Sequence, residues 1–128
     1  MGLNFNHAMV YVADVGRALE FYEGLLGLIR IEGSPEFGYA RLRFPQGEAT
    51  LALHLAEKGR EIGCGGIRLY FEVAELDEFC EGLVTKGVQF RQLPRHMPWG
   101  WRHAYLNDPD GHEISLFAAG EKRFRASP

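Results

Sequence analysis

The pattern of strands and helices that the sequence predicts runs through the chain twice. Each half begins with an alternating apolar strand, continues with an amphipathic helix that ends at a glycine, and finishes with three further strands. Val12 and Val73 occupy equivalent places in the two halves, and so do Leu55 and Leu116, each pair 61 positions apart (73 − 12 and 116 − 55). An internal repeat of this kind constrains the fold more than any single motif does. The sequence therefore predicts two β-α-β-β-β modules in tandem.

In the first half, Asp14 is a good N-cap for the helix, because its side chain can accept a hydrogen bond from the first helical turn. Gly27 is a suitable C-cap. The apolar stripe of this helix consists of Val15, Leu19, Tyr22 and Leu26. The predicted strands cover residues 6–12, 28–32, 39–44 and 50–55.

In the second half, the predicted strands cover residues 67–73, 88–93, 102–107 and 113–117, and the helix covers residues 76–86. The last two strands flank the sequence Asp-Pro-Asp-Gly at 108–111. Pro109 sets φ for the second position of a turn, and Gly111 accepts a positive φ. This pattern predicts a β-hairpin.

Length and composition describe one globular domain over residues 1–128, with module one at about 4–57, module two at about 66–119 and a polar tail at 120–128. Hydrophobic residues make up 46% of the chain, which is enough for a core. The net charge of −3 gives no reason to expect nucleic acid or a membrane surface. Two cysteines make no disulfide framework, and no apolar run is long enough to span a membrane. We expect a cytoplasmic protein.

The tandem modules, the helix ending FYEGLLGL at 21–28 and the sequence NDPDGHEISL at 107–116 resemble the vicinal oxygen chelate superfamily. That superfamily includes glyoxalase I, extradiol dioxygenases and bleomycin-resistance proteins. The resemblance implies an α+β fold in which the two modules form a curved, half-open sheet around a ligand pocket. It also implies a homodimer. The same fold hosts lyases, isomerases, dioxygenases and metal-free binders, so it does not define the reaction.

In metal-bearing members of this superfamily, the ligands lie on the first and last strands of each module. Carried over to this chain, the resemblance places these positions at His7, His54, Arg68 and Ser115. The repeat spacing of 61 residues also pairs His7 with Arg68 and His54 with Ser115. Arg68 stays protonated and cannot bind a metal, and Ser115 is a poor ligand. Glu113 is a third possible ligand, on the same strand face as Ser115, for Fe, Mn, Zn or Ni. The alternative is that both histidines are bonded to their neighbours and that Glu113 lies in solvent, with no cofactor.

Arginines suggest a different kind of site. Arg68, with Tyr70 on the same strand face, is placed to bind a carboxylate or phosphate through two hydrogen bonds. Arg41, Arg43 and Arg102 alternate with core-facing residues, which directs them either toward the same pocket or into solvent. If Arg102 faces the pocket, its neighbour in the chain, His103, faces the helices.

Trp99 and Trp101 flank Gly100 just before the hairpin. A Pro-Trp-Gly segment here resembles bleomycin-resistance-like members, in which aromatic residues line the ligand groove. A flat ligand could stack on such rings. The alternative is that both tryptophans pack in the core or at a dimer contact.

Two hypotheses follow. The first is a glyoxalase- or bleomycin-resistance-like protein that holds a small organic anion with Arg68, Tyr70, Ser115 and the two tryptophans, as a binder or an atypical enzyme. The alternative is a metal-dependent lyase or dioxygenase that uses His7, His54 and Glu113. The sequence does not separate an enzyme from a binder.

Overall fold

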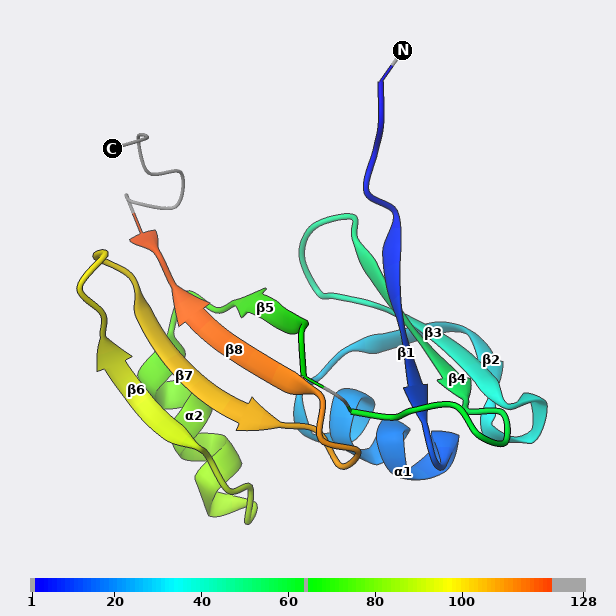
Figure 1. Ribbon diagram of the computed structural model, residues 1–128. Coiled ribbons are helices and arrows are strands. Elements are labelled where there is room, and N and C mark those ends of the chain that lie inside the picture. Colours follow the sequence, from blue (N-terminus) through cyan, green and yellow to red (C-terminus); the bar gives the residue numbers. More distant parts are fainter. Residues whose placement is uncertain (1, 64, 121–128) are drawn as a thin grey trace. The chain divides into compact units, whose positions relative to one another are not determined.

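A computed structural model describes residues 2–63 and 65–120. These residues form two compact units, one of residues 2–63 together with 109–111 and the other of 65–108 together with 112–120. Each unit has one four-stranded mixed sheet with a helix after its first strand (Figure 1). This is the α+β tandem of β-α-β-β-β modules that the sequence predicts. Within the described residues, no helix is long and apolar enough to cross a membrane.

The first unit orders its strands β1-β4-β3-β2, with β1 parallel to β4 and the other pairs antiparallel. Its elements are β1 (His7–Val12), α1 (Val15–Leu19), the π-helix η1 (Glu20–Leu25), β2 (Ile29–Ser34), the short 3₁₀-helix η2 (Pro35–Phe37), β3 (Tyr39–Arg43) and β4 (Thr50–Leu55).

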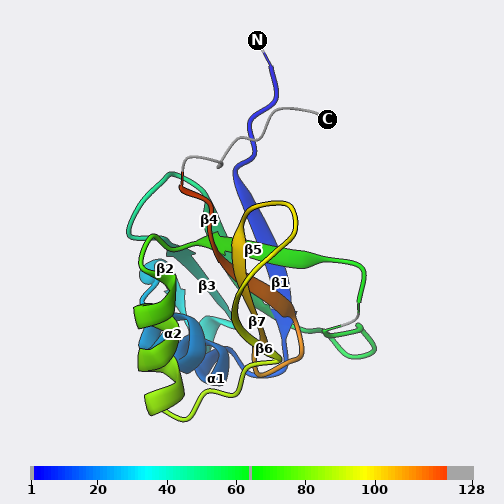
Figure 2. The ribbon, with the colours of Figure 1, turned by 90° about the vertical axis from the view of Figure 1, so that its left-hand side faces the viewer.

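The second unit has the same topology, in the order β5-β8-β7-β6, with β5 parallel to β8. Its elements are β5 (Arg68–Glu72), α2 (Leu76–Thr85), β6 (Gln92–His96), β7 (Arg102–Asn107) and β8 (Glu113–Ala118). In Figure 2, α2 lies beside the strands of its own sheet, and it contacts β6 and β8.

The helix of the first unit begins as predicted and then widens. The Asp14 side chain accepts a hydrogen bond from the Arg17 N–H at 2.9 Å. The predicted stripe is buried from Val15 to Leu26. From Glu20 the turns become those of a π-helix, in which Phe21 and Tyr22, although adjacent, are both buried.

Each sheet buries the face that meets its helix. The apolar side chains of alternate strand positions are excluded from solvent there, among them Val12, Leu42, Leu51 and Leu53 in the first unit and Leu106, Ile114 and Leu116 in the second. The opposite face of each sheet carries polar and aromatic side chains, and we call it the open face of that unit.

The second strand of the second unit lies further along the chain than predicted. The sequence favours residues 88–93 for it, but β6 runs from Gln92 to His96 and includes Pro94. Proline cannot donate to a sheet ladder, so a strand containing it is restricted to an edge or an irregularity. β6 has both, because it is the edge strand and its register shifts between Gln92 and Arg95.

The predicted hairpin is confirmed, with Asn107 opposite Glu113 and φ of +90° at Gly111. Its turn, residues 109–111, groups with the first unit although both of its strands belong to the second. The reason is Asp110, whose Oδ1 accepts hydrogen bonds from the Ala13 N–H at 3.2 Å and from Arg17 Nη2 at 2.6 Å.

Candidate functional site

The open face of the second unit is set by the pairing of β5, β8 and β7. Tyr70 lies opposite Ser115, and Ser115 lies opposite Tyr105. Two residues further along β8, Phe117 lies opposite His103. Paired residues in a sheet point to the same face, so these five side chains share one surface.

His103 is therefore on the opposite face from the one expected. Its neighbour Arg102 points to the helix side, where Arg102 Nε and Nη2 donate to the Asp77 carboxylate of α2 at 3.1 and 3.2 Å. Strand alternation then turns His103 to the open face, where it is 1% exposed.

The hydrogen bonds of His103 fix its tautomer. Trp99 Nε1–H donates to His103 Nε2 at 3.2 Å, and an indole nitrogen can only donate. In the neutral imidazole, the proton is therefore on Nδ1, which donates to Ser115 Oγ at 2.6 Å. Burial, together with the positive charge of Arg68, lowers the pKa of His103 and favours this neutral form. Because His103 donates to Ser115, it does not act as a base toward that hydroxyl.

Five aromatic rings surround His103 on the open face of the second unit, with ring centroids 5.6 to 5.9 Å from the imidazole. They belong to Tyr70, Trp99, Trp101, Tyr105 and Phe117, and we call these rings with His103 the aromatic cluster. Trp101 and Phe117 are stacked at 4.9 Å with an interplanar angle of 9°. Tyr70 and Trp99 remain 51% and 40% exposed, so the cluster presents aromatic surface to solvent.

Arg68 lies at the edge of the aromatic cluster. Its guanidinium carbon is 4.7 Å from the centroid of the Tyr105 ring, which is cation–π distance. Its Nη2 is 3.0 Å from Glu113 Oε1, and Arg91 Nη1 is 3.9 Å from the same oxygen. Interactions with Tyr70 and Glu113 raise the pKa of Arg68, so the group stays charged. Two arginines thus surround Glu113, an environment that repels a metal cation.

The open face of the first unit carries both predicted histidines. His7 Nδ1 is 2.7 Å from Asn6 Oδ1 and 3.2 Å from Arg41 Nη2. His54 Nδ1 is 2.8 Å from the Leu55 carbonyl oxygen, to which it can donate.

The register separates the two histidines. His7 pairs with Thr50, whereas His54 pairs with Tyr11, four residues further along both strands. Four residues of strand correspond to about 13 Å. Donor atoms in a zinc site lie roughly 2 Å from the metal, so His7 and His54 do not share one ion in this arrangement.

The register also changes the alignment of the two modules. His7 pairs with Thr50 and Arg68 pairs with Glu113, so β4 corresponds to β8 at an offset of 63 (113 − 50) and not 61. The counterpart of Ser115 is therefore Ala52 and not His54. An offset read from apolar alternation is uncertain by two residues, because a shift of two leaves every side chain on its own face.

The residues present do not fit the metal ring of the superfamily. Of the four equivalent positions, only His7 has a metal-binding side chain; the others are Ala52, the cation Arg68 and the hydrogen-bonded Ser115. Across residues 2–63 and 65–120, no group of three His, Cys, Asp or Glu side chains is placed to hold a metal ion.

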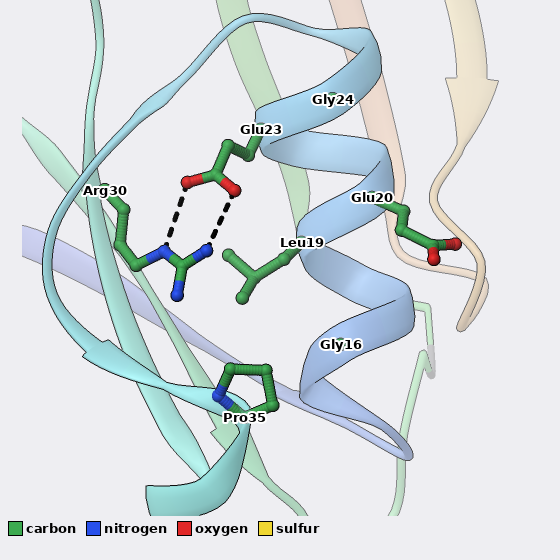
Figure 3. Close-up of a pocket in the computed structure, with 7 residues that line it drawn as sticks. All are labelled: Gly16, Leu19, Glu20, Glu23, Gly24, Arg30 and Pro35. Carbon is green, nitrogen blue, oxygen red and sulfur yellow. Dashed lines mark hydrogen bonds and ion pairs between the residues drawn. The ribbon is translucent and has the colours of Figure 1, made fainter.

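A pocket of about 320 Å³ lies away from the predicted site residues, between the helical segment and β2 of the first unit. Figure 3 shows Leu19 and Pro35 in its wall and the ion pair between Glu23 and Arg30 at its side. The Arg30 Nη2 atom is 3.0 Å from Glu23 Oε1. Glu20 adds a second carboxylate to the lining, and the exposed wall is otherwise mostly apolar.

Residues 4–116 match the model of the Glyoxalase/Bleomycin resistance protein/Dioxygenase superfamily, and the chain belongs to that family. It is 26% identical over 126 residues to a probable lactoylglutathione lyase of Synechocystis sp., a match that covers 91% of this chain and 96% of the relative.

Two solved structures of the fold are also similar. A member of the same superfamily from Sphaerobacter thermophilus has a TM-score of 0.76 and 28% identity, covering 91% of this chain and 98% of that one. TnmS3, an antibiotic binding protein from a Streptomyces species, has a TM-score of 0.77 and 25% identity, covering 91% and 96%.

Proposed function

We propose that this protein binds a flat organic anion on the open face of the second unit. The observation that carries the proposal is the aromatic cluster, in which the Tyr70 and Trp99 rings are half-exposed and the guanidinium of Arg68 lies against the Tyr105 ring. A planar ligand can stack on these rings. Its anionic group can replace the Glu113 carboxylate as the hydrogen-bonding partner of Arg68. Ser115 orients His103 and, through it, Trp99.

Two comparisons bear on the choice between binding and metal-dependent chemistry. TnmS3 is described as an antibiotic binding protein, and it shares the fold over nearly the whole chain. Relatives at 26% to 27% identity are described as lactoylglutathione lyases, which is the support for the alternative of a metal-dependent lyase or dioxygenase. Against it, His7, His54 and Glu113 are not placed to share one metal ion. The arginines beside His7 and Glu113 favour the binder, as a homodimer of the kind common in this superfamily.

Tryptophan fluorescence provides a direct test, because the only two tryptophans of the chain, Trp99 and Trp101, are both in the aromatic cluster. Anthraquinone-2-carboxylate should quench this fluorescence with saturation, and its neutral carboxamide should bind more weakly. Arg68→Gln should remove that difference, at a cost of roughly tenfold in affinity for the acid. Arg102→Gln, on the other side of the same sheet, is the matched control.

Equal affinity for the acid in Arg68→Gln and in the unsubstituted protein would contradict the role of Arg68. Metal analysis of the same purified protein tests the alternative. Stoichiometric metal that is lost in His7→Ala would favour the lyase or dioxygenase and contradict the binder.

A further inference from the structure

Arg41, in the centre of β3, is a half-buried arginine held by neutral groups. Its Nε donates to Thr50 Oγ1 at 3.0 Å. Its Nη2 donates to Asn6 Oδ1 and lies 3.2 Å from His7 Nδ1. These contacts come from the segment before β1, from β1 and from β4, so they fix the guanidinium on the open face of the first unit.

The same contacts leave the charge of Arg41 without a counter-ion. A guanidinium has five N–H donors. Thr50 Oγ1 accepts from Nε and Asn6 Oδ1 accepts from Nη2, whereas His7 Nδ1 itself donates to Asn6 Oδ1 and takes no donor of Arg41. Within residues 2–63 and 65–120, no acceptor in the protein meets the two donors on Nη1, and no carboxylate lies within ion-pairing distance of Arg41. A partly desolvated cation without a partner favours an anion from solution.

The surface beside Arg41 is apolar on one side. Across the strands, Arg41 pairs with Ala52 and Ala52 pairs with Met9, which is 39% exposed. Ala52 itself is fully buried, so Met9 is the apolar side chain that this row presents to solvent. The next row on this face is aromatic, since the His54 ring lies 5.6 Å from that of Tyr11 and 6.1 Å from that of Tyr39.

One carboxylate is a possible competitor. Glu32 lies opposite Arg41 in the β2–β3 pairing. Its Oε1 instead accepts a hydrogen bond from the Tyr39 hydroxyl at 3.2 Å. Arg43 shares this face and donates to the Phe44 carbonyl oxygen at 3.3 Å, so its charge adds to that of Arg41.

We propose that Arg41 anchors an oxyanion site on the open face of the first unit, which takes the carboxylate or phosphate group of a small organic molecule. The two Nη1–H donors bind the oxyanion, and the apolar part of the ligand lies against Met9 and the neighbouring aromatic row. Asn6 and Thr50 act as positioning residues that hold the guanidinium. This site shares no residue with the aromatic cluster, so its test can fail or succeed independently of the proposed function.

The test is an NMR titration of the full chain with phenyl phosphate, benzoate and inorganic phosphate. Saturable shifts are expected at the Arg41 Nε–H and at the backbone amides of Met9 and Thr50. Arg41→Gln should weaken binding about tenfold or more, because a charge-assisted bidentate contact is lost. Arg41→Lys keeps the positive charge but not the paired N–H donors of the guanidinium, so its affinity should lie between those of the unsubstituted protein and Arg41→Gln. Shifts with phenyl phosphate alone assign a phosphate site, and shifts with both aryl anions assign a general oxyanion site.

Two matched variants separate this site from general surface charge. Arg43→Gln removes one charge from the same strand and should change affinity less than about twofold, since exposed charges are screened by salt. Glu32→Gln removes the competing carboxylate and should tighten binding. Equal losses in Arg41→Gln and Arg43→Gln would overturn the proposal, as would the absence of saturable shifts with all three anions. Shifts at Arg68 with none at Arg41 would overturn it and leave the proposed function intact. If Arg41→Gln does not fold, the shift map of the unsubstituted protein and the Arg41→Lys titration decide.

Discussion

His103 is the residue on which the ring contacts of the second unit converge, and its protonation affects the stability of the fold. The pKa of this buried imidazole is lowered in the folded protein by desolvation and by Arg68, whereas in the unfolded chain it is about 6.5. The unfolded state therefore binds more protons as the pH falls below about 6.5. The stabilisation is complete above that pH and is lost progressively as the pH falls through the folded pKa.

We predict that His103→Gln loses less free energy of unfolding than the unsubstituted protein when the pH falls from about 7.5 to about 5. Urea denaturation at a series of pH values measures this difference. His96→Gln is the control, because His96 is an exposed histidine of β6. Parallel curves for His103→Gln and the unsubstituted protein would contradict the prediction.

The position of His103 was within reach of the sequence, because the predicted hairpin itself implies that Ser115 and His103 share a face. Asn107 opposite Glu113 places Tyr105 opposite Ser115 and His103 opposite Phe117. The prediction failed because it started from the charge of Arg102 and not from the turn. The hydrogen bond from Trp99 was beyond sequence reasoning, since it depends on the path of the loop.

At the level of elements, strand pairs depend on a few backbone positions that only glycine tolerates. Gly33 has φ of +83° at the irregular β2–β3 pairing, and a Cβ atom there would lie 2.2 Å from the Tyr39 carbonyl oxygen. Gly27 has almost the same φ, +85°, but a Cβ atom there would have open space around it, with no non-neighbouring heavy atom of the described residues within 4 Å.

This contrast predicts different costs for the same substitution. Gly27→Ala incurs only the left-handed backbone strain, about 1–2 kcal/mol. Gly33→Ala adds a backbone clash that must shift β2 or β3, and we expect a loss of about 3 kcal/mol or more. Thermal and chemical denaturation of the two variants measures the difference. Similar stabilities would show that β2 moves away from β3 without cost.

Element types followed from periodicity, whereas register did not. Alternation and caps located β1, β3, β4, β7 and β8 to within a residue or two at each end, since each has one apolar face. β6 was misplaced because Pro94 and an exposed edge give no alternation. The alignment of His54 with Ser115 failed for a related reason, because a shift of two residues preserves the apolar pattern.

At the level of the whole molecule, the turn at 109–111 makes the first unit depend on a segment far along the chain. Asp110 has a side chain only 3% exposed, and it accepts hydrogen bonds from Ala13 and Arg17. Asp77, by contrast, forms an exposed ion pair with Arg102, with 57% of the Asp77 side chain accessible.

We predict that Asp110→Ala lowers the free energy of unfolding by about 1–3 kcal/mol, because the Ala13 N–H and the Arg17 guanidinium lose a charged acceptor. Asp77→Ala should cost less than about 1 kcal/mol, as for other exposed ion pairs. Hydrogen exchange of the amides of β1 and α1 should accelerate in Asp110→Ala alone. Equal effects of the two substitutions would contradict a special role for the turn.

The same turn has a consequence for synthesis on the ribosome. A chain that has reached residue 64 contains every strand of the first sheet but lacks Asp110, whose carboxylate meets the start of α1. Domains fold in general as they emerge, from the N-terminus onward. Here the first unit acquires the two hydrogen bonds of Asp110 only after most of the second has been translated, so its contacts are not complete when its own last strand has emerged.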